Sequence, residues 1–311
     1  MFSKIKTEVD GIASIKVTGL GRYSLTDTLE CGQCFRFEKK IGADKTEYVG
    51  VVKGILVDVI EENTGELIFV GASDEEADKL IEYFALDRNQ AKIREEISAL
   101  TDSDWLRRAA EYGEGIAILR QDPWEALVSF IISQNNNIPR IKKIVREISA
   151  EYGVNLCLQG GADKCPFGVI STTPCQEKCK TCGRCYTFPT ARDILDRPEG
   201  LLPSKPGFRF SYILDAAEKV ASGKCSLEDI KSKNSYLYTM EELTKIKGVG
   251  PKVASCTALF GFANLEAFPI DVWMKRAIDT YFDGKLDPEA LGRYAGIAQQ
   301  YIFHYIRNIE N

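Results

Sequence analysis

The hydrophobic periodicity of this chain changes once, near residue 73, and that change is the strongest constraint on its fold. Before it, short β-branched or aromatic runs are separated by Gly, Asp and Asn, as in an antiparallel meander. The runs are 12–17, 34–37, 48–52, 55–59 and 67–70. From Asp74 onwards apolar residues recur at helical spacing, and no strand–helix alternation follows. The sequence predicts an α+β protein, with a small antiparallel β domain over 1–73 and a mainly helical domain over 74–311.

Helical periodicity defines the larger domain. On the first expected helix, one face carries Ala77, Leu80, Ile81, Phe84 and Ala85. Further helices are expected over 124–134, 140–152, 210–221 and 288–309. Residues 155–187 break this pattern, because they are rich in Gly, Pro and Cys and show little periodicity. We interpret this segment as a cysteine-rich insertion between two helices.

The charge balance limits the partners that the chain can have. A formal charge of -5 and a pI of about 5.3 are not those of a general polyanion binder. Any contact with DNA must therefore come from a local basic face or from helix N-termini. The first residues lack a long apolar segment, and no stretch approaches roughly 18 apolar residues, so we expect no membrane contact and a cytoplasmic protein. The single histidine, His304, excludes chemistry that needs several histidines, and we expect it to be structural.

A glycine-rich turn is the most informative local motif. The stretch 243–256 predicts a helix that ends at Gly248 and a second helix that starts just after Gly250, which together form a helix-hairpin-helix at about 240–260. Glycine permits the positive φ of a tight turn, and Pro251 suits the first helical position. Free N–H groups at the second helix would hold a DNA phosphate without any side-chain charge. An ordinary packing corner would explain the two glycines equally well.

Lys252 is the candidate nucleophile. It falls in the first turn of the second helix, where the helix dipole disfavours a protonated amine. The apolar neighbours Val253, Ala254 and Phe260 would exclude water from it. A lysine amine attacks as a nucleophile only when it is neutral, so this is a suitable position. Taken alone, however, a lysine is far more often a solvated surface charge.

Asp271 is the candidate partner of Lys252. It follows an apolar, proline-containing segment and opens an amphipathic helix, which predicts an N-cap. The chain turns back through 261–264, so the start of this helix could lie close to Lys252. A carboxylate there would stabilise positive charge on a sugar and assist proton transfers. The cap role and the catalytic role are compatible.

These motifs together resemble a known family. Gly248-Val-Gly-Pro-Lys252 and Phe268-Pro-Ile-Asp271 resemble the helix-hairpin-helix, Gly/Pro…Asp signature of the DNA glycosylase superfamily, in which the lysine marks bifunctional glycosylase/lyase members. Further segments resemble the 8-oxoguanine DNA glycosylase family, and the resemblance covers nearly the whole chain except the insertion. These segments are 31–36, 121–124, 133–140, 207–209 and 296–303.

The resemblance implies a pocket for a flipped base. Gly32 would offer its backbone carbonyl to the N7–H that oxidation creates, where normal guanine carries a repelling acceptor. Gln299 would read the Watson–Crick edge, and Cys256 and Phe303 would sandwich the base. Without the resemblance, Gly32 is explained as a bulge glycine, and Cys256 and Phe303 as helix core.

The resemblance also implies contacts with the opposite strand. Asn135 would contact the widowed partner base, while Arg140 and Arg209 would read cytosine, whose acceptors suit a guanidinium. The simpler alternatives are an Asn-rich helix terminus and two phosphate-binding arginines.

Four positions depart from the family pattern. Trp273 stands where animal-type members have histidine, and Ile306 replaces the acid that pairs with it. Phe208 replaces a tyrosine near the widowed base, and Cys34 replaces a serine. These departures concern the fine contacts with phosphate and partner base, and they leave the nucleophile unchanged.

The function implied is base-excision repair. We expect a monomeric enzyme that binds double-stranded DNA, excises 8-oxoguanine opposite cytosine through a Lys252 Schiff base, and nicks the strand as an AP lyase without a cofactor. One alternative is a lysine-dependent glycosylase for another damaged base. The other is a non-catalytic helix-hairpin-helix DNA-binding module, which would need neither Lys252 with Asp271 nor Gln299.

The insertion carries a compact cysteine cluster that the resemblance does not explain: Cys175, Cys179, Cys182 and Cys185. Ten cysteines in a chain expected in a reducing compartment favour thiols or metal ligands over disulfides. Two consecutive gaps of two residues are typical of iron–sulfur ligation, whereas zinc usually takes two separated halves. We therefore expect a structural zinc ion or iron–sulfur cluster, with unliganded thiols as the alternative. The spacing also matches radical enzymes that use S-adenosylmethionine, but the strand–helix repeats of that fold are absent.

Overall fold

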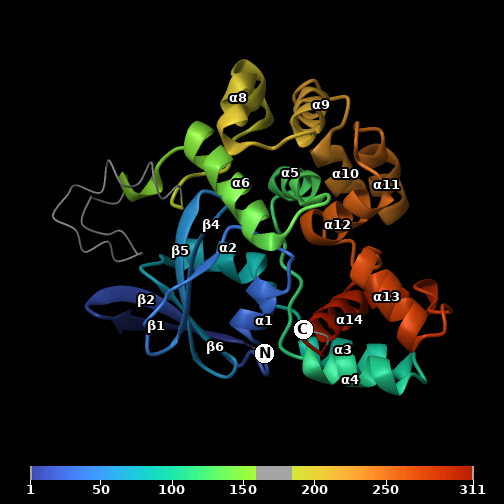
Figure 1. Ribbon diagram of the computed structural model, residues 1–311. Helices are drawn as coiled ribbons and strands as arrows, with labels where there is room; N and C mark the ends of the chain where they lie inside the picture. The colour runs from blue at the N-terminus through green and yellow to red at the C-terminus, as the bar shows by residue number, and fades with distance from the viewer. Residues whose placement is uncertain (1, 159–183, 310–311) are drawn as a thin grey trace.

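The computed structural model describes residues 2–158 and 184–309, and it shows an antiparallel sheet beside a larger group of helices (Figure 1). The six strands are antiparallel in the order β1-β2-β6-β5-β4-β3. Their bounds are β1 Ser3–Val9, β2 Ile12–Thr18, β3 Glu38–Lys39, β4 Thr46–Val52, β5 Ile55–Asn63 and β6 Glu66–Val70. The predicted α+β class is confirmed.

The sheet contains an edge strand that periodicity did not predict. β1 pairs with β2 across a two-residue turn, in which Asp10 and Gly11 have φ of 51° and 77°. Both values are left-handed, as the tightest hairpins require. The strand has no apolar alternation because it lies at the sheet edge, with most of its side chains exposed. A period-2 signal arises only where one face of a strand is buried.

The predicted strand at 34–37 is wrong. These residues form a buried irregular segment after helix α1 (Leu25–Glu30), and only the next two residues pair with β4 as β3. Phe35 packs into the helical core and Phe37 into the sheet core. A short apolar run cannot distinguish a buried strand from a buried segment that joins two cores.

The helices follow the predicted pattern more closely. Helices α2, α5, α6 and α9 match expected ones. The single helix expected over 288–309 is wrong, because η3 precedes α14 and Gly292, at φ 62°, interrupts η3. No helix among the described residues is long and apolar enough to cross a membrane. The bounds are α2 Asp74–Tyr83, α3 Gln90–Ala99, α4 Asp104–Tyr112, α5 Pro123–Ser133, α6 Ile138–Tyr152, η1 Leu156–Leu158, α8 Ala191–Asp196, η2 Pro198–Ser204, α9 Arg209–Ala221, α10 Leu227–Lys233, α11 Tyr236–Thr244, α12 Pro251–Gly261, α13 Val272–Tyr281, η3 Glu289–Tyr294 and α14 Ala295–Ile309.

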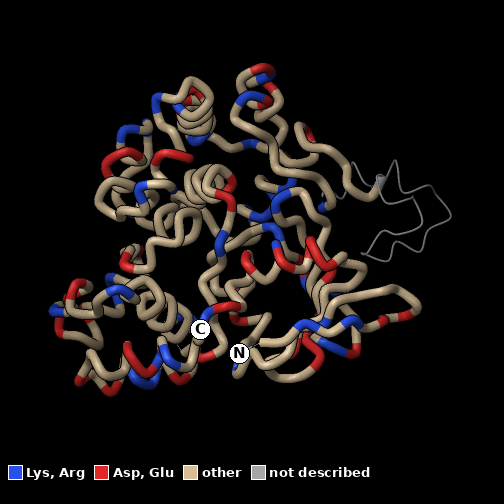
Figure 2. Tube along the Cα trace, turned by 180° about the vertical axis from the view of Figure 1, so that it is seen from behind, with Lys and Arg blue, Asp and Glu red and all other residues tan. Residues whose placement is uncertain are grey.

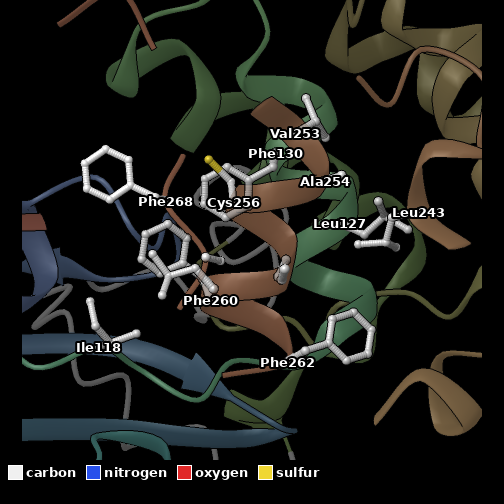
Figure 3. Close-up of a cluster of buried hydrophobic side chains, with 14 of the residues drawn as sticks. Ile118, Leu127, Phe130, Leu243, Val253, Ala254, Cys256, Phe260, Phe262 and Phe268 are labelled. Atoms are coloured by element: carbon white, nitrogen blue, oxygen red, sulfur yellow. The ribbon is translucent and has the colours of Figure 1, made fainter. Parts of the chain in front are cut away.

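Two hydrophobic cores hold the fold together. The sheet core includes Ala77, Leu80 and Ile81 of α2, so this core extends beyond residue 73. The helical core centres on α5, which is apolar on nearly every side and lies in the middle of the helices (Figure 1). There α12 packs on α5, with the rings of Phe130 and Phe260 stacked at 5.3 Å between centroids (Figure 3). This packing fixes α12, and with it the position of Lys252.

Candidate active site

The turn before α12 uses its two glycines differently. Helix α11 ends at Thr244, one turn earlier than predicted. Gly248 has φ +78°, and a Cβ there would lie 2.3 Å from the Tyr212 ring. Gly250 is extended at φ -89°, so of the two glycines only Gly248 uses the positive φ that glycine permits. The Cβ position of Gly250 is open, with no described atom within 4 Å. Gly248 is therefore needed for the turn, and Gly250 leaves the helix start accessible.

Helix α12 begins at Pro251 as predicted, and within the described structure no side chain caps it. Its first N–H groups therefore remain available to a ligand at the positive end of the helix dipole. Gly250 and Pro251 are both exposed. This is the geometry that binds an anion without side-chain charge.

Lys252 lies half-buried in the first turn of α12 and leans onto α5. Its Nζ donates to Ser133 Oγ at 3.4 Å and lies 5.6 Å from the centroid of the Phe130 ring. It forms no ion pair with any residue that the structure describes. Its neighbours include the Ser133 hydroxyl, the Phe130 ring and the Cys256 thiol, and none of these carries a negative charge that would hold the amine.

Asp271 caps α13, as predicted, because its Oδ1 accepts the backbone N–H of Met274 at 2.9 Å. The same residue lines a cavity with Lys252. The helix start therefore holds the carboxylate in one orientation beside the lysine.

The cavity brings six of the expected residues together. It measures about 50 Å³, and the expected residues that line it are Gly32, Lys252, Cys256, Asp271, Gln299 and Phe303. A volume this small cannot hold a purine, since ligand pockets measure roughly 300–1,000 Å³. Side chains would have to move apart for the cavity to receive a ligand of that size.

Four further residues line the cavity although the sequence analysis gave them no place in the site's recognition or chemistry: Phe130, Phe260, Pro269 and Gln300. The two phenylalanines lie with Cys256 in the cluster formed by α5 and α12 (Figure 3). Helical periodicity marks Phe130, Phe260 and Cys256 as core, and all three belong to the helical core. Gln300 carries no separate signal, because neighbours in a helix normally point in directions about 100° apart.

The walls of the cavity are mainly uncharged. Burial raises the pKa of the Cys256 thiol to about 11, although the nearby Lys252 charge acts to lower it. This thiol stays neutral at physiological pH and offers a polarisable surface. Gly32 has φ +86°, while a Cβ there would make only ordinary contacts, the nearest at 3.6 Å from Phe303 and Ile138. Its backbone conformation, rather than crowding, is what favours glycine.

The residues expected to contact the opposite strand differ in exposure. Asn135 is exposed in the turn after α5 with a left-handed φ of 48°, and Arg140 is exposed at the start of α6. Arg209 is only 4% exposed, and its guanidinium donates to the carbonyl oxygens of Gln134, Asn135 and Pro206. It therefore holds the Asn135 turn from beneath in this conformation.

The family departures are spread around the site. Phe208 is exposed, with the Arg209 guanidinium 4.4 Å from its ring centroid. Trp273 is half-buried on α13, Ile306 is fully buried, and burial raises the pKa of the Cys34 thiol. Of the four residues, only Phe208 presents a large apolar surface to solvent.

Only the two ends of the cysteine-rich insertion are described. Asn155 and Tyr186 form an antiparallel bridge, and Arg36 donates to the carbonyl of Tyr186. Cys175, Cys179 and Cys182 lie outside the described residues, and Cys185 is buried at the base of the segment. Within 2–158 and 184–309, no group of three His, Cys, Asp or Glu residues is arranged to hold a metal.

Charge is distributed as expected for an acidic protein. Basic and acidic positions are interspersed along the chain in both the sheet and the helices (Figure 2). A DNA-binding face must therefore be local, as at the start of α12.

A β domain, a helix-hairpin-helix and a lysine–aspartate cavity define the class as a helix-hairpin-helix DNA glycosylase. Residues 17–127 match the family model of the 8-oxoguanine DNA glycosylase N-terminal domain. The solved structure of MBOgg1 in complex with a low-affinity DNA ligand is 30% identical and has a TM-score of 0.83, covering 100% of both chains. The 8-oxoguanine glycosylase/lyase of Clostridium acetobutylicum, solved with double-stranded DNA containing cytosine opposite 8-oxoG, is 31% identical with a TM-score of 0.81, covering 100% of this chain and 99% of that one.

Among curated proteins, the N-glycosylase/DNA lyase of Saccharomyces cerevisiae is 29% identical over 275 residues. The match covers 81% of this chain and 66% of the yeast protein's length. The chain belongs to the 8-oxoguanine DNA glycosylase/lyase family, and it is a DNA-repair glycosylase with lyase activity. The alternative of a non-catalytic binding module is therefore wrong.

Proposed function

We propose that this enzyme flips 8-oxoguanine out of duplex DNA and excises it with Lys252 as the nucleophile. The observation that carries the proposal is the shared cavity, in which Lys252 and Asp271 lie with the four residues expected to bind the base. The proposal joins a nucleophile and a recognition surface within one enclosed space.

The chemistry follows from these two groups. Lys252 Nζ forms a bond to C1′ of the damaged nucleotide while the glycosidic bond breaks and its electron pair leaves with the base. Asp271 stabilises the positive charge that develops on the sugar. Opening of the sugar ring gives a Schiff base, and loss of a C2′ proton then breaks the C3′–O bond and nicks the strand.

Recognition of the lesion uses the walls of the cavity. The Gly32 carbonyl accepts the N7–H of the oxidised base, Gln299 binds the Watson–Crick edge, and Cys256 and Phe303 cover the two faces. The neutral Cys256 thiol supports this role, because it presents a polarisable and uncharged surface to one face of the base.

Recognition of the duplex uses the exposed turns. Asn135 fills the gap that the flipped base leaves in the DNA base stack, and Arg140 and Arg209 bind the opposite cytosine. The N–H groups after Gly250 bind a backbone phosphate. Arg209 must leave the carbonyl oxygens that it now holds. The Clostridium relative, solved with cytosine opposite 8-oxoG, supports cytosine as the partner.

Borohydride trapping tests the proposal directly. Reduction should capture a covalent complex with duplex DNA containing 8-oxoguanine opposite cytosine, and Lys252→Gln should lose both trapping and excision while still binding DNA. Lys92→Gln, which changes an exposed lysine on α3, is the matched control and should trap normally. Excision by Lys252→Gln at the wild-type rate would overturn the mechanism. Preferential trapping on a different damaged base would favour the alternative that this enzyme is a lysine-dependent glycosylase for that base.

We also propose that Cys175, Cys179, Cys182 and Cys185 bind a structural zinc ion or iron–sulfur cluster. The support is their spacing and the burial of Cys185. Elemental analysis of protein purified without oxygen tests it, and less than about a tenth of an equivalent of zinc or iron would end it. No catalytic step needs this metal.

We further propose that the enzyme acts as a cytoplasmic monomer. Sedimentation with and without DNA, together with cell fractionation, tests this, and a stable dimer in either state would contradict it.

A further inference from the structure

Gln300 lies beside Gln299 on α14 and has no role in the proposed function. It is 4% exposed and lines the same cavity as Lys252. Its Nε2 donates to Gln299 Oε1 at 3.0 Å. Its own Oε1 is buried without a hydrogen-bond partner among the described residues. A buried amide oxygen of this kind loses its hydration without compensation, unless a ligand supplies the donor.

The packing of α14 explains why two consecutive glutamines reach one cavity. The N–H of Gly296 donates to Leu265 O at 2.7 Å. A Cβ on Gly296 would lie 2.5 Å from both the Ala267 carbonyl oxygen and Leu259 Cδ1. The start of α14 is therefore pressed against the connection between α12 and α13. Gln299 and Gln300 lie one turn before Phe303, at i−4 and i−3, so all three can line one side of the cavity.

Gln299 and Gln300 together leave three hydrogen-bonding groups available to a ligand. Gln299 retains its Nε2 donor, which has no partner in the described parts of the chain, and a second lone pair on Oε1. Gln300 adds the unpartnered acceptor. The set is therefore one donor and two acceptors. A guanine-type base presents the complement on its Watson–Crick edge, namely the O6 acceptor, the N1–H donor and the exocyclic 2-amino donor.

We propose that Gln300 is a second specificity-determining residue of the base pocket, whose Oε1 accepts a hydrogen bond from the exocyclic 2-amino group of the flipped purine. This assignment rests on the proposed function, because it requires the cavity to receive the base. Gln299 then donates to O6 and accepts from N1–H, while the bond from Gln300 Nε2 keeps its amide in the required orientation. An oxidised purine without a 2-amino group leaves Gln300 Oε1 buried and without a hydrogen-bond donor.

Two substrates that differ only in this amino group test the assignment. We expect the wild type to excise 8-oxoguanine with a kcat/KM about 10- to 100-fold above that for 8-oxohypoxanthine, in otherwise identical duplexes. Gln300→Met keeps the length and burial of the side chain but removes the amide. We expect it to reduce this ratio to within about threefold of unity, mainly by slowing excision of 8-oxoguanine.

The design separates specificity from folding. The ratio of two kcat/KM values measured on one preparation does not depend on the fraction of active enzyme. Tyr301→Phe is the control, because it removes a buried hydroxyl that is also unpartnered in the described structure but does not line the cavity. Its ratio should equal that of the wild type.

The outcomes are distinct. An unchanged ratio in an active Gln300→Met enzyme, or equal losses on both bases, overturns the role of Gln300 and leaves the proposed function standing. If the wild type fails to trap on 8-oxoguanine at all, the proposed function is overturned, and the assignment of Gln300 falls with it.

Discussion

Two cavities in this molecule differ in size and chemistry. The cavity at Lys252 measures about 50 Å³, whereas one between the β4–β5 turn, the start of α5 and the end of α9 measures about 500 Å³. The larger one is lined by charged residues that include Lys53, Asp122 and Glu125. Only the smaller one combines a lysine, a carboxylate, amides and an aromatic face. Volume therefore does not locate the chemistry in this protein.

The difference has a physical cause. The smaller cavity lies within the helical core, where the rings of Phe130 and Phe260 stack and Cys256 packs beside them, so little space remains between them. The larger cavity lies between several elements, and its lining includes the exposed residues Lys53 and Asp122. Burial raises the pKa of Glu125 to about 7, although the nearby Arg36 charge acts to lower it. A perturbed carboxyl usually suggests a functional site, but the lysine that lines this cavity, Lys53, is exposed and forms an ion pair with Glu82.

The largest effect expected after loss of the nucleophile is that of Asp271→Asn. Asparagine caps a helix as well as aspartate, so α13 should remain intact while the negative charge is lost. We expect excision to fall by on the order of 10²–10⁴, with DNA binding changed much less. Single-turnover excision and thermal melting measure the two properties. A near-normal excision rate would show that Asp271 acts only as the cap of α13. Lys252 would then be the one catalytic group that we propose in the small cavity.

A smaller effect is expected at Arg140, which lines neither of these two cavities. Arg140→Ala should reduce the preference for cytosine over the other partner bases by about 10-fold, because a guanidinium contact to a base is worth roughly 1–3 kcal/mol. Total activity should fall less than the preference. The control is Arg108→Ala, an exposed arginine on α4. If the wild type excises equally well opposite all four bases, Arg140 is a phosphate contact.

The smallest effect on activity is expected in the large cavity. The pKa of Glu125 is higher in the folded protein than in the unfolded chain, so its protonated form favours folding. The contribution of Glu125 to the free energy of unfolding is therefore fully present below about pH 4.5 and is lost as pH rises through about 7. Glu125→Gln removes this loss, so at pH 8 the variant should be more stable by about 1 kcal/mol, a value reduced because Glu125 is only half-buried. Melting curves at pH 5 and pH 8 check the sign. Impaired excision at an unchanged melting temperature would show that the large cavity is functional after all.

Local sequence was sufficient for the parts of the site that depend on a single turn of chain. Pro251 begins α12, Lys252 falls in its first turn, and Asp271 caps α13, because capping and dihedral preferences act within four residues. The same holds for the strands with one buried face. Local sequence did not predict β1 or the irregular segment 34–37. Exposure at the sheet edge in the first case, and burial between two cores in the second, removes the periodic signal.

Only the tertiary structure decided which of these residues meet. Gly32 reaches the cavity from the segment after α1, and Gln300 reaches it because the start of α14 is pressed against the α12–α13 connection. Only the structure shows that the Arg209 guanidinium also binds the carbonyl oxygens of Gln134 and Asn135, and so supports the Asn135 turn. Propensity and periodicity describe neighbours along one element, whereas these contacts join residues up to hundreds of positions apart. Their geometry is set by how closely whole helices pack, which no local pattern encodes.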